Sequence, residues 1–271
     1  MRGYPRNRLT DRSDAAPVVT KTVLSRGYAI SYEDAGAGPV LLLIPGSTMS
    51  AADWRDAGYV DLLVGSHRVI SVDPLGNGLS DKPHDPDAYR WPDVAADLIA
   101  VLDHAGVDLA TAWGYSRGGA LAAALAVEYP DRVSGVILHD GVPSEIAEGS
   151  PPTAAAIAMF GGDLSPIWDA YSFSDDDRRY DEEVNDVRAL GAMGIGPRRS
   201  GASIDLGRVR APALVLEGSN DDPDSSGVVA AALGVELQIL PGLNHLEAFS
   251  EVALAMSFVR PFLDRVGAGK G

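Results

Sequence analysis

The sequence predicts an α/β protein in which a mostly parallel sheet carries helices on both faces. Short continuous apolar runs, typical of strands buried on both faces, alternate along the chain with helical patterns. The composition is that of an ordinary globular protein, with 46% hydrophobic and 22% charged residues in a chain of 271. This length suits one large domain with an insertion.

The predicted strands begin with an antiparallel hairpin. Apolar and polar residues alternate over residues 18–35 on either side of Arg26 and Gly27, as in a half-exposed hairpin. The apolar runs that follow cover residues 39–46, 68–76, 109–116, 132–141, 211–219 and 235–242. We expect each of these runs to form a buried strand of the sheet.

The predicted helices lie between and after these runs. They cover residues 51–64, 91–106, 117–129, a weaker stretch near 225–233, and 247–266. Pro92 stands near the start of one helix and Gly106 at its end, where these residue types are common. In a sheet built this way, ligands bind outside the carboxyl ends of the parallel strands.

Two stretches depart from the alternation of strands and helices. Residues 142–207 contain no strand-like run. Because a structureless loop of this length is uncommon inside a compact domain, we expect a small helical cap there, inserted between core segments 18–141 and 208–271. Residues 1–17 contain arginines but lack the apolar stretch of roughly 7–15 residues found in secretory signals, so we expect a flexible leader.

Charge and composition narrow the classes of partner. A formal net charge of −16 repels phosphate backbones and anionic membranes, so we expect neither nucleic-acid nor membrane partners. The chain has no cysteine, which excludes disulfides, thiolate metal sites and a cysteine nucleophile, and is consistent with a cytoplasmic protein. A homodimer is the one protein assembly that we consider.

The most informative functional pattern is Gly114-Tyr115-Ser116-Arg117-Gly118, which fits G-x-S-x-G between a predicted strand and a predicted helix. A sharp turn in that position strains the serine backbone and leaves no room for side chains at the flanking positions. The start of the helix directs N–H groups and a positive partial charge to the place where an oxyanion would form. We therefore predict that Ser116 is a nucleophile.

On these residues the chain resembles the alpha/beta-hydrolase family, over about residues 20–266. The shared stretches are LLLIPG followed by Ser47, DPLGNGLSD at 73–81, GYSRGG at 114–119, LEGSNDD at 216–222 and PGLNH at 241–245. The resemblance implies an eight-stranded, mostly parallel sheet with a cap inserted after the sixth strand. It also implies a triad in the chain order nucleophile, acid, histidine.

The resemblance implies that the base follows the last strand. Of the five histidines, only His245 stands there, and we predict that it takes the proton of Ser116 and later returns it to the leaving group. We assign His67 and His84 to surface loops and His104 to a helix end. His139 lies within a predicted strand, where it either fills the core, which we favour, or lines the pocket.

The acid is expected after the seventh strand, where it would orient the histidine. The family spacing G-x-x-D, counted from Gly218, ends on Asp221, which is the predicted acid. Asp222 precedes a proline and suits a turn, and Asp140 ends the sixth strand, where some relatives carry the acid; both are weaker alternatives. Asp73 is interpreted as part of a tight turn with Gly-x-Gly rather than as a catalytic carboxylate.

An oxyanion hole needs two backbone donors. By resemblance they are the N–H groups of Arg117, after the nucleophile, and of Ser47, after the third strand. The sequence departs from the family here, because Pro45-Gly46 replaces the usual His-Gly. Proline fixes its own φ and lacks a donor, but it leaves the N–H of Ser47 in place. We expect the Arg117 side chain to pair with a carboxylate rather than to touch substrate.

The expected substrate pocket is largely apolar. Its predicted lining residues are Thr48, Met49, Tyr115, Pro143, Met159, Phe160 and Trp168. With no cationic anchor among them, we predict that a neutral, moderately hydrophobic carboxylic ester or lactone is cleaved through an acyl-enzyme.

Other chemistries stay open. A serine at the elbow excludes relatives that attack with aspartate, but hydrolysis of a carbon–carbon bond in a diketone-like substrate is an alternative. The same fold also serves non-hydrolytic lyases, cyclases and ligand receptors. We expect no cofactor, since no Walker or dinucleotide glycine pattern follows the first parallel strand. We expect no metal, since the acidic run SDDDRRYDEE at 174–183 lacks ligand spacing.

Overall fold

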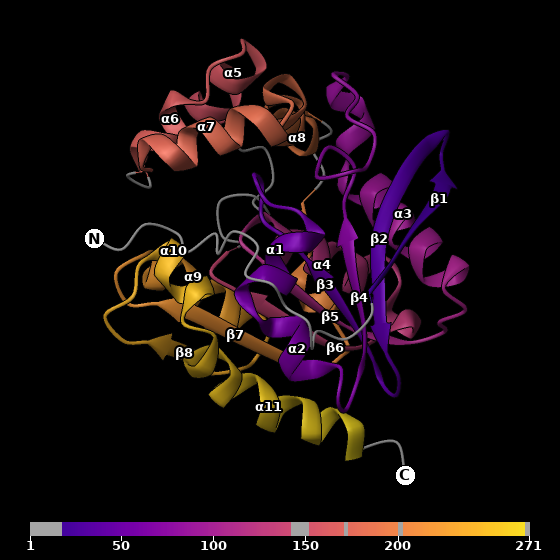
Figure 1. Cartoon of the computed structure of the whole chain (residues 1–271). Coiled ribbons are helices and arrows are strands. Elements are labelled where there is room, and N and C mark those ends of the chain that lie inside the picture. The colour runs from indigo at the N-terminus through magenta and orange to yellow at the C-terminus, as the bar shows by residue number, and fades with distance from the viewer. Residues whose placement is uncertain (1–17, 142–151, 171–172, 200–202, 269–271) are drawn as a thin grey trace.

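The computed structural model describes residues 18–141, 152–170, 173–199 and 203–268 (Figure 1). The predicted leader, 1–17, and the first part of the predicted cap, 142–151, lie outside the described residues.

In the described part of the chain, eight strands form one sheet in the order β1-β2-β4-β3-β5-β6-β7-β8 (Figure 1). Their bounds are β1 Val19–Ser25, β2 Tyr28–Gly36, β3 Val40–Ile44, β4 Arg68–Asp73, β5 Ala110–Tyr115, β6 Val133–His139, β7 Ala213–Gly218 and β8 Leu237–Leu240. The hairpin β1–β2 is antiparallel, and β2 pairs antiparallel with β4. Every other pair is parallel, so the predicted fold class is confirmed.

The helices alternate with these strands. They are α1 Ala51–Ala57, α2 Tyr59–Leu63, α3 Trp91–His104, α4 Arg117–Glu128, α5 Ala154–Phe160, α6 Ser165–Ala170, α7 Asp175–Val184, α8 Val187–Arg199, α9 Pro223–Ala232, α10 His245–Ser250 and α11 Val252–Ala268. Short 3₁₀ turns are η1 Pro86–Tyr89, η2 Pro130–Arg132 and η3 Leu206–Arg208.

Two helices predicted as continuous are each broken in two. Residues 51–64 divide into α1 and α2, because Gly58 takes a left-handed φ of 99° that ends the first helix. The helix predicted over 247–266 divides at Glu251, whose ψ of 61° is not helical. Its first part, α10, also begins earlier than predicted, because the Asn244 side chain accepts a hydrogen bond from the N–H of Glu247 and caps the helix.

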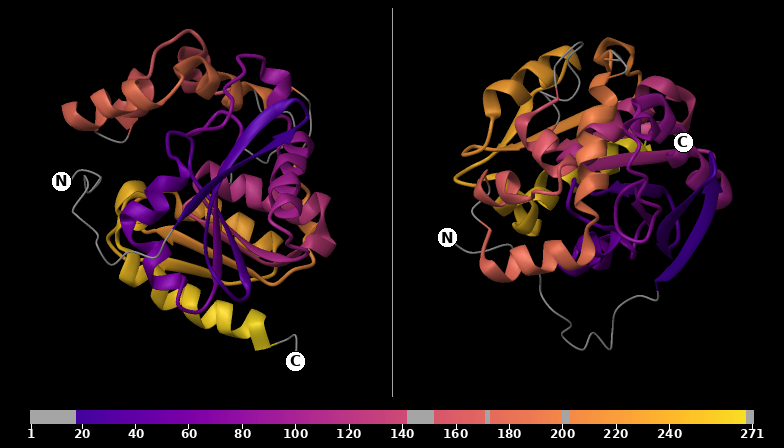
Figure 2. Two further views of the ribbon diagram at one scale, coloured as in Figure 1. Left: turned by 45° about the vertical axis from the view of Figure 1, so that its right-hand side comes forward. Right: turned by 90° about the horizontal axis from the view of Figure 1, so that it is seen from above.

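Helices cover both faces of the sheet (Figure 2). The side chains of α3, α4 and α9 pack on one face, and those of α1, α2 and α11 pack on the other. On the second face four aromatic rings meet at centroid distances of 4.9–5.2 Å, and they are Trp54, Tyr59, Trp113 and Phe249. Aromatic pairs of this kind add about 0.5–1.5 kcal/mol beyond their burial, so this cluster fixes α1, α2 and α10 against β5.

The helices α5–α8 lie between β6 and β7 in the chain, in the segment predicted as a cap, and are called the cap (Figure 1). Within it, α5 and α8 approach closely, because a Cβ on Gly191 would lie 2.1 Å from the Phe160 nitrogen. The contacts between the cap and the carboxyl edge of the sheet include the following two. The Asn185 amide donates to the Thr48 carbonyl at 3.2 Å, beyond β3, and Met193 packs on Gly76, beyond β4.

No helix in the described ranges combines the length and the apolar character that crossing a membrane requires.

Candidate active site

Ser116 occupies a strained turn between β5 and α4. Its φ of 53° and ψ of −127° are a conformation that a non-glycine residue adopts at a cost of about 1–3 kcal/mol. The flanking glycines make the turn possible: a Cβ on Gly114 would lie 1.9 Å from the Gly118 oxygen, and one on Gly118 would lie 2.1 Å from the Ile44 oxygen. The Ser116 N–H donates to the His139 carbonyl at 2.9 Å, which ties the turn to β6.

His245 connects Ser116 to Asp221. Its Nε2 lies 2.9 Å from the Ser116 Oγ, and its Nδ1 lies 2.7 Å from the Asp221 Oδ2. His245 is the first residue of α10, and its carbonyl accepts a hydrogen bond from the buried Tyr115 hydroxyl at 2.7 Å. The structure thus brings together the three residues that the sequence singled out, from the ends of β5 and β7 and the start of α10.

Asp221 lies on the turn after β7. Its N–H donates to the Gly218 carbonyl at 3.1 Å, and the preceding Asn220 N–H donates to the Leu243 carbonyl at 2.9 Å. Burial acts to raise the pKa of Asp221, but the hydrogen bond from His245 and the charge of that ring outweigh it and lower the pKa below its ordinary value. An ionised Asp221 would hold the His245 ring with its Nδ1 protonated and its Nε2 free to accept a proton.

The alternative carboxylates are engaged elsewhere. Asp222 caps α9, where its side chain accepts from the Ser225 N–H at 3.3 Å. Asp73 is buried and accepts from the N–H groups of Ala51 at 2.6 Å and Leu79 at 3.0 Å, so it holds a turn.

Asp140 is fully buried behind the triad with Glu217, an acid that the sequence reasoning did not select. Asp140 Oδ1 accepts from the Gly218 N–H at 2.7 Å, and Glu217 Oε2 accepts from the Ser226 hydroxyl at 2.6 Å. Burial, followed by the charge of Glu217, raises the pKa of Asp140 to about 9, and burial raises the pKa of Glu217 to about 7. A glutamate inside the apolar run 211–219 was the signal that could have found this pair.

Asp140, Asp221 and His245 also present oxygen and nitrogen atoms within 4.8 Å of one another, a spacing that could hold a metal ion. Both ring nitrogens of His245 already face partners, Ser116 and Asp221, at hydrogen-bond distance. The arrangement therefore suits proton transfer better than metal binding.

His139 lies in the core, as its place in a strand suggested. It is fully buried, with its ring against those of Trp113 and Tyr115. Burial, followed by the charge of His245, lowers the pKa of His139 to about 3, so this ring stays neutral at physiological pH.

The loop after β3 passes beside the nucleophile. A Cβ on Gly46 would lie 3.1 Å from the Ser116 Cβ, which places the Gly46–Ser47 peptide next to Ser116. On the other side, Arg117 begins α4 and is buried, with its guanidinium over the Trp91 ring at 5.6 Å. The two predicted oxyanion donors, the N–H groups of Ser47 and Arg117, therefore belong to segments on either side of the serine.

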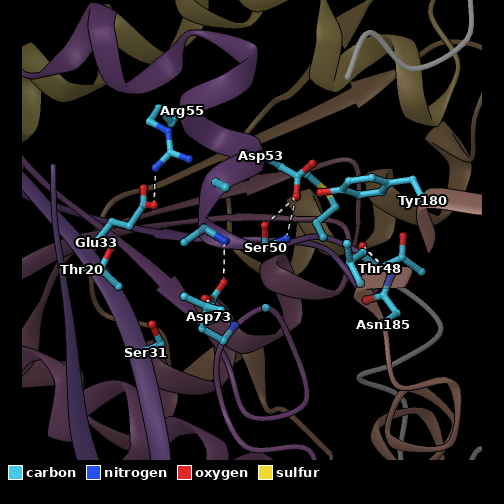
Figure 3. Close-up of a pocket in the computed structure, with 16 residues that line it drawn as sticks. Thr20, Ser31, Glu33, Thr48, Ser50, Asp53, Arg55, Asp73, Tyr180 and Asn185 are labelled. Carbon is cyan, nitrogen blue, oxygen red and sulfur yellow. Dashed lines mark hydrogen bonds and ion pairs between the residues drawn. The ribbon is translucent and has the colours of Figure 1, made fainter. Parts of the chain in front are cut away.

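A pocket of about 390 Å³ lies between α1, β2 and the cap helix α7 (Figure 3). Thr48 and Met49, two of the residues predicted for the substrate pocket, line it, and the cap contributes Tyr180, Val184 and Asn185. Ser116, Asp221 and His245 are not among its lining residues. Figure 3 shows Tyr180 extending toward Asp53. The charged side chains of the lining are three carboxylates and one guanidinium, and they are Glu33, Asp53, Asp73 and Arg55.

The other predicted pocket residues do not line this cavity. Met159 is buried in the core cluster, Phe160 is 38% exposed at the end of α5, and Trp168 lies under the Arg178 guanidinium at 5.5 Å. Tyr115 points to α10 instead, where its hydroxyl bonds the His245 carbonyl. Pro143, also expected in the pocket, lies outside the described residues.

Comparison with known proteins finds similarity to hydrolases. A family model for the alpha/beta hydrolase fold matches residues 39–164. The chain is 35% identical over 139 residues to the 2-hydroxymuconate semialdehyde hydrolase of Pseudomonas sp. strain CF600. That match covers 49% of this chain and 48% of the relative, so it spans about half of the relative's length.

Two solved structures are similar over almost the whole chain. The enol-lactonase from Burkholderia xenovorans LB400 has a TM-score of 0.74 at 22% identity, covering 90% of this chain and 98% of its own. A carboxylesterase structure from the thaumarchaeon Nitrososphaera gargenis has a TM-score of 0.74 at 20% identity, covering 92% of this chain and 100% of its own. At these identities the likeness establishes the fold.

Proposed function

Because this chain belongs to the alpha/beta-hydrolase family, we propose that it is a serine hydrolase that cleaves a neutral, moderately hydrophobic carboxylic ester or lactone. The observation that carries the proposal is the pair of hydrogen bonds that links Asp221 to His245 at 2.7 Å and His245 to Ser116 at 2.9 Å. A nucleophile, a base and an orienting carboxylate in this order form the arrangement that activates a serine.

The proposed reaction has two halves. Ser116 Oγ attacks the substrate carbonyl carbon while His245 Nε2 takes the hydroxyl proton, and the carbonyl oxygen becomes an oxyanion facing the N–H groups of Ser47 and Arg117. The tetrahedral intermediate collapses as His245 gives its proton to the leaving alcohol oxygen, which leaves an acyl group on Ser116. Water, deprotonated by His245, then attacks the acyl carbon and releases the acid and the free serine.

None of the triad residues lines the pocket beside α7, but its lining residue Met49 lies next to Gly46, which neighbours Ser116. We take this pocket as part of the substrate site, and its charge then favours a neutral substrate. Its carboxylates outnumber its single guanidinium, that of Arg55, which is already paired with Glu33. An anionic substrate would meet no unpaired cation among these lining residues and would be repelled by the acids. The enol-lactonase and carboxylesterase folds are consistent with ester or lactone chemistry in such a scaffold.

A second candidate is hydrolysis of a carbon–carbon bond. The observation that favours it is the 35% identity to 2-hydroxymuconate semialdehyde hydrolase, which is a carbon–carbon bond hydrolase. The same serine, base and oxyanion donors could act on a ketone carbonyl, with a carbanion rather than an alkoxide as the leaving group.

A labelling and substrate panel tests both candidates. A fluorophosphonate probe is expected to label wild-type protein and to leave Ser116→Ala unlabelled. Turnover of short p-nitrophenyl esters and of simple lactones, with no turnover of a vinylogous diketone, would support the ester or lactone proposal. Turnover of the diketone alone would replace it with the carbon–carbon candidate, and no labelling of the wild type would contradict both.

A further inference from the structure

A buried amide lies behind the loop that carries Ser47. Asn77 is 1% exposed, on the turn after β4, and its Nδ2 lies 3.1 Å from the Gly46 oxygen and 2.8 Å from the oxygens of Ser47 and Met49. Carbonyl oxygens only accept hydrogen bonds, so the NH₂ group and not the amide oxygen faces the loop. One side chain therefore holds three peptide units of residues 46–49.

These contacts fix the direction of the neighbouring N–H groups. In a planar trans peptide, the carbonyl and the following N–H point in opposite directions. Holding the Gly46 oxygen toward Asn77 therefore turns the Ser47 N–H away from Asn77, and holding the Ser47 oxygen does the same for the Thr48 N–H. Among the described residues, no group accepts a hydrogen bond from the Ser47 N–H. The donor is thus oriented, and the described part of the chain offers it no acceptor.

Asn77 itself stands on a rigid support. Its N–H donates to the Pro74 carbonyl at 2.9 Å, and its own carbonyl accepts from the Ser80 N–H at 3.0 Å. The same turn is tied to the start of α1, because the buried Asp73 side chain accepts from the Ala51 N–H at 2.6 Å. The amide of Asn77 consequently cannot follow the loop if the loop moves, and it acts as a fixed anchor.

We propose that Asn77 is the positioning residue of the oxyanion hole: its amide holds residues 46–49 so that the Ser47 N–H faces the oxygen of a substrate bound at Ser116. This inference rests on the proposed serine-hydrolase function. It gives a physical reason why a loop with Pro45 before Gly46 can present its donor, since the direction of the donor is set from the neighbouring turn. A displacement of about 1 Å in a catalytic group can cost about 10²-fold in rate.

A buried asparagine could instead serve stability alone, and the same turn offers a matched control. Ser80 is also buried, its hydroxyl donates to the Asp73 carbonyl at 2.5 Å, and it accepts from the Ser31 N–H at 2.8 Å. Neither hydrogen bond of the Ser80 hydroxyl involves residues 46–49. Ser80→Ala therefore removes buried hydrogen bonds from the same turn while leaving the loop anchor intact.

The test compares Asn77→Ala, the milder Asn77→Ser and the control Ser80→Ala on an ester that the wild type hydrolyses. The readouts are Tm, kcat, KM and inhibition by a trifluoromethyl ketone, which forms an oxyanion on the serine. We expect Asn77→Ala to lower kcat and to weaken the ketone by about 10²-fold each, with KM changed by less than about threefold. Ser80→Ala should lower Tm while kcat and ketone inhibition stay within about threefold of wild type.

The outcomes separate the two levels of the proposal. Suppose that the wild type is active and Asn77→Ala folds. If Asn77→Ala then keeps the wild-type kcat, or if Asn77→Ala and Ser80→Ala both lose kcat in proportion to their loss of Tm, the role of Asn77 is overturned and the proposed function is not. If Asn77→Ala does not fold, the kcat and ketone inhibition of Asn77→Ser decide in the same way. A wild type that neither reacts with the fluorophosphonate nor turns over esters would overturn the proposed function, and the role of Asn77 with it.

Discussion

The core and the cap of this molecule are built in different ways. In the core, α4 is buried at every position from Arg117 to Val127, and backbone hydrogen bonds tie the turn at Ser116 to β6. In the cap, α7 is mainly charged and largely exposed, whereas α5 and α8 bury apolar side chains such as Met159 and Met193 against the core. A well-packed core tolerates little displacement, whereas an exposed helix can vary in sequence at little cost.

Because of this difference, we expect substitutions in the core and in the cap to affect catalytic rates in different ways. Substitutions at the triad act on groups that would touch the reacting atoms of every substrate, so they should lower all rates together. Substitutions on α7 act on the wall of the pocket, so they should change the ratio of rates between substrates.

The largest effect is expected from the nucleophile and the base. If Ser116 and His245 act as one unit, Ser116→Ala should lower kcat by about a millionfold, and adding His245→Ala should cost little more. The kinetics of the two single variants and the double variant check this. Losses that add up on a logarithmic scale would show that the two residues do not work together.

The next largest effect is expected from the acid. Asp221→Asn should preserve the fold but favour the wrong tautomer of His245, which lowers kcat by about ten-thousandfold. Asp140→Asn, whose side chain lies behind the triad, and Asp222→Asn, at the start of α9, serve as controls and should be far milder. A severe loss in Asp140→Asn alone would move the acid to the end of β6.

The same division explains how much could be predicted from the sequence. In the core, continuous apolar runs and the G-x-S-x-G stretch are local signals that report burial and a strained turn directly, so the strands and the position of Ser116 could be placed. Breaks within helices were missed, because Gly58 and Glu251 end their helices through backbone angles that periodicity does not reveal.

Contacts between distant segments were harder to predict. Asn77 is the middle residue of the Gly-x-Gly stretch that was interpreted as part of a tight turn. Nothing local shows that its amide reaches the loop at Gly46, which is 31 positions away in the chain. In the cap, the apolar residues Met159 and Phe160 were the natural choice for a pocket wall. The pocket beside α7 is lined by Tyr180, which comes from a run of charged residues, and no local pattern in that run indicates which of its side chains reaches a cavity.

A smaller effect is expected from the cap. Tyr180 and Phe160 are similarly exposed aromatic residues, at 37% and 38%, but only Tyr180 lines the described pocket. Tyr180→Ala should change the ratio of kcat/KM between bulky and short esters. The change should correspond to about 1–3 kcal/mol of activation free energy, since pocket contacts discriminate between substrates on that scale. The matched Phe160→Ala should leave the ratio unchanged, and fluorophosphonate labelling of Ser116 should proceed in both. Equal loss on all esters in Tyr180→Ala would mean that the cap shares in the chemistry.

The last prediction concerns the pH dependence of stability rather than a reaction rate. Because the pKa of Asp140 is raised to about 9 in the folded protein, from roughly 4 in an unfolded chain, the native state binds more protons than the unfolded state between these values. The free energy of unfolding therefore falls as pH rises through that window, and the contribution is flat below it and above it. Asp140→Asn mimics the protonated acid and removes this loss.

We expect the difference in Tm between Asp140→Asn and wild type to grow as the pH rises from 5 to 9. It should grow by about 2–4 °C for each kcal/mol of unfolding free energy that the wild type loses and the variant keeps. Thermal unfolding at several pH values measures the difference. Glu182→Gln, which neutralises an exposed acid on α7, is the matched control and should show no such trend. Both substitutions replace a carboxylate by its amide, but Asp140 is enclosed by β6 and β7 beside Glu217, whereas Glu182 faces water. A Tm difference for Asp140→Asn that stays constant with pH would mean that this carboxyl group is already ionised in the folded core.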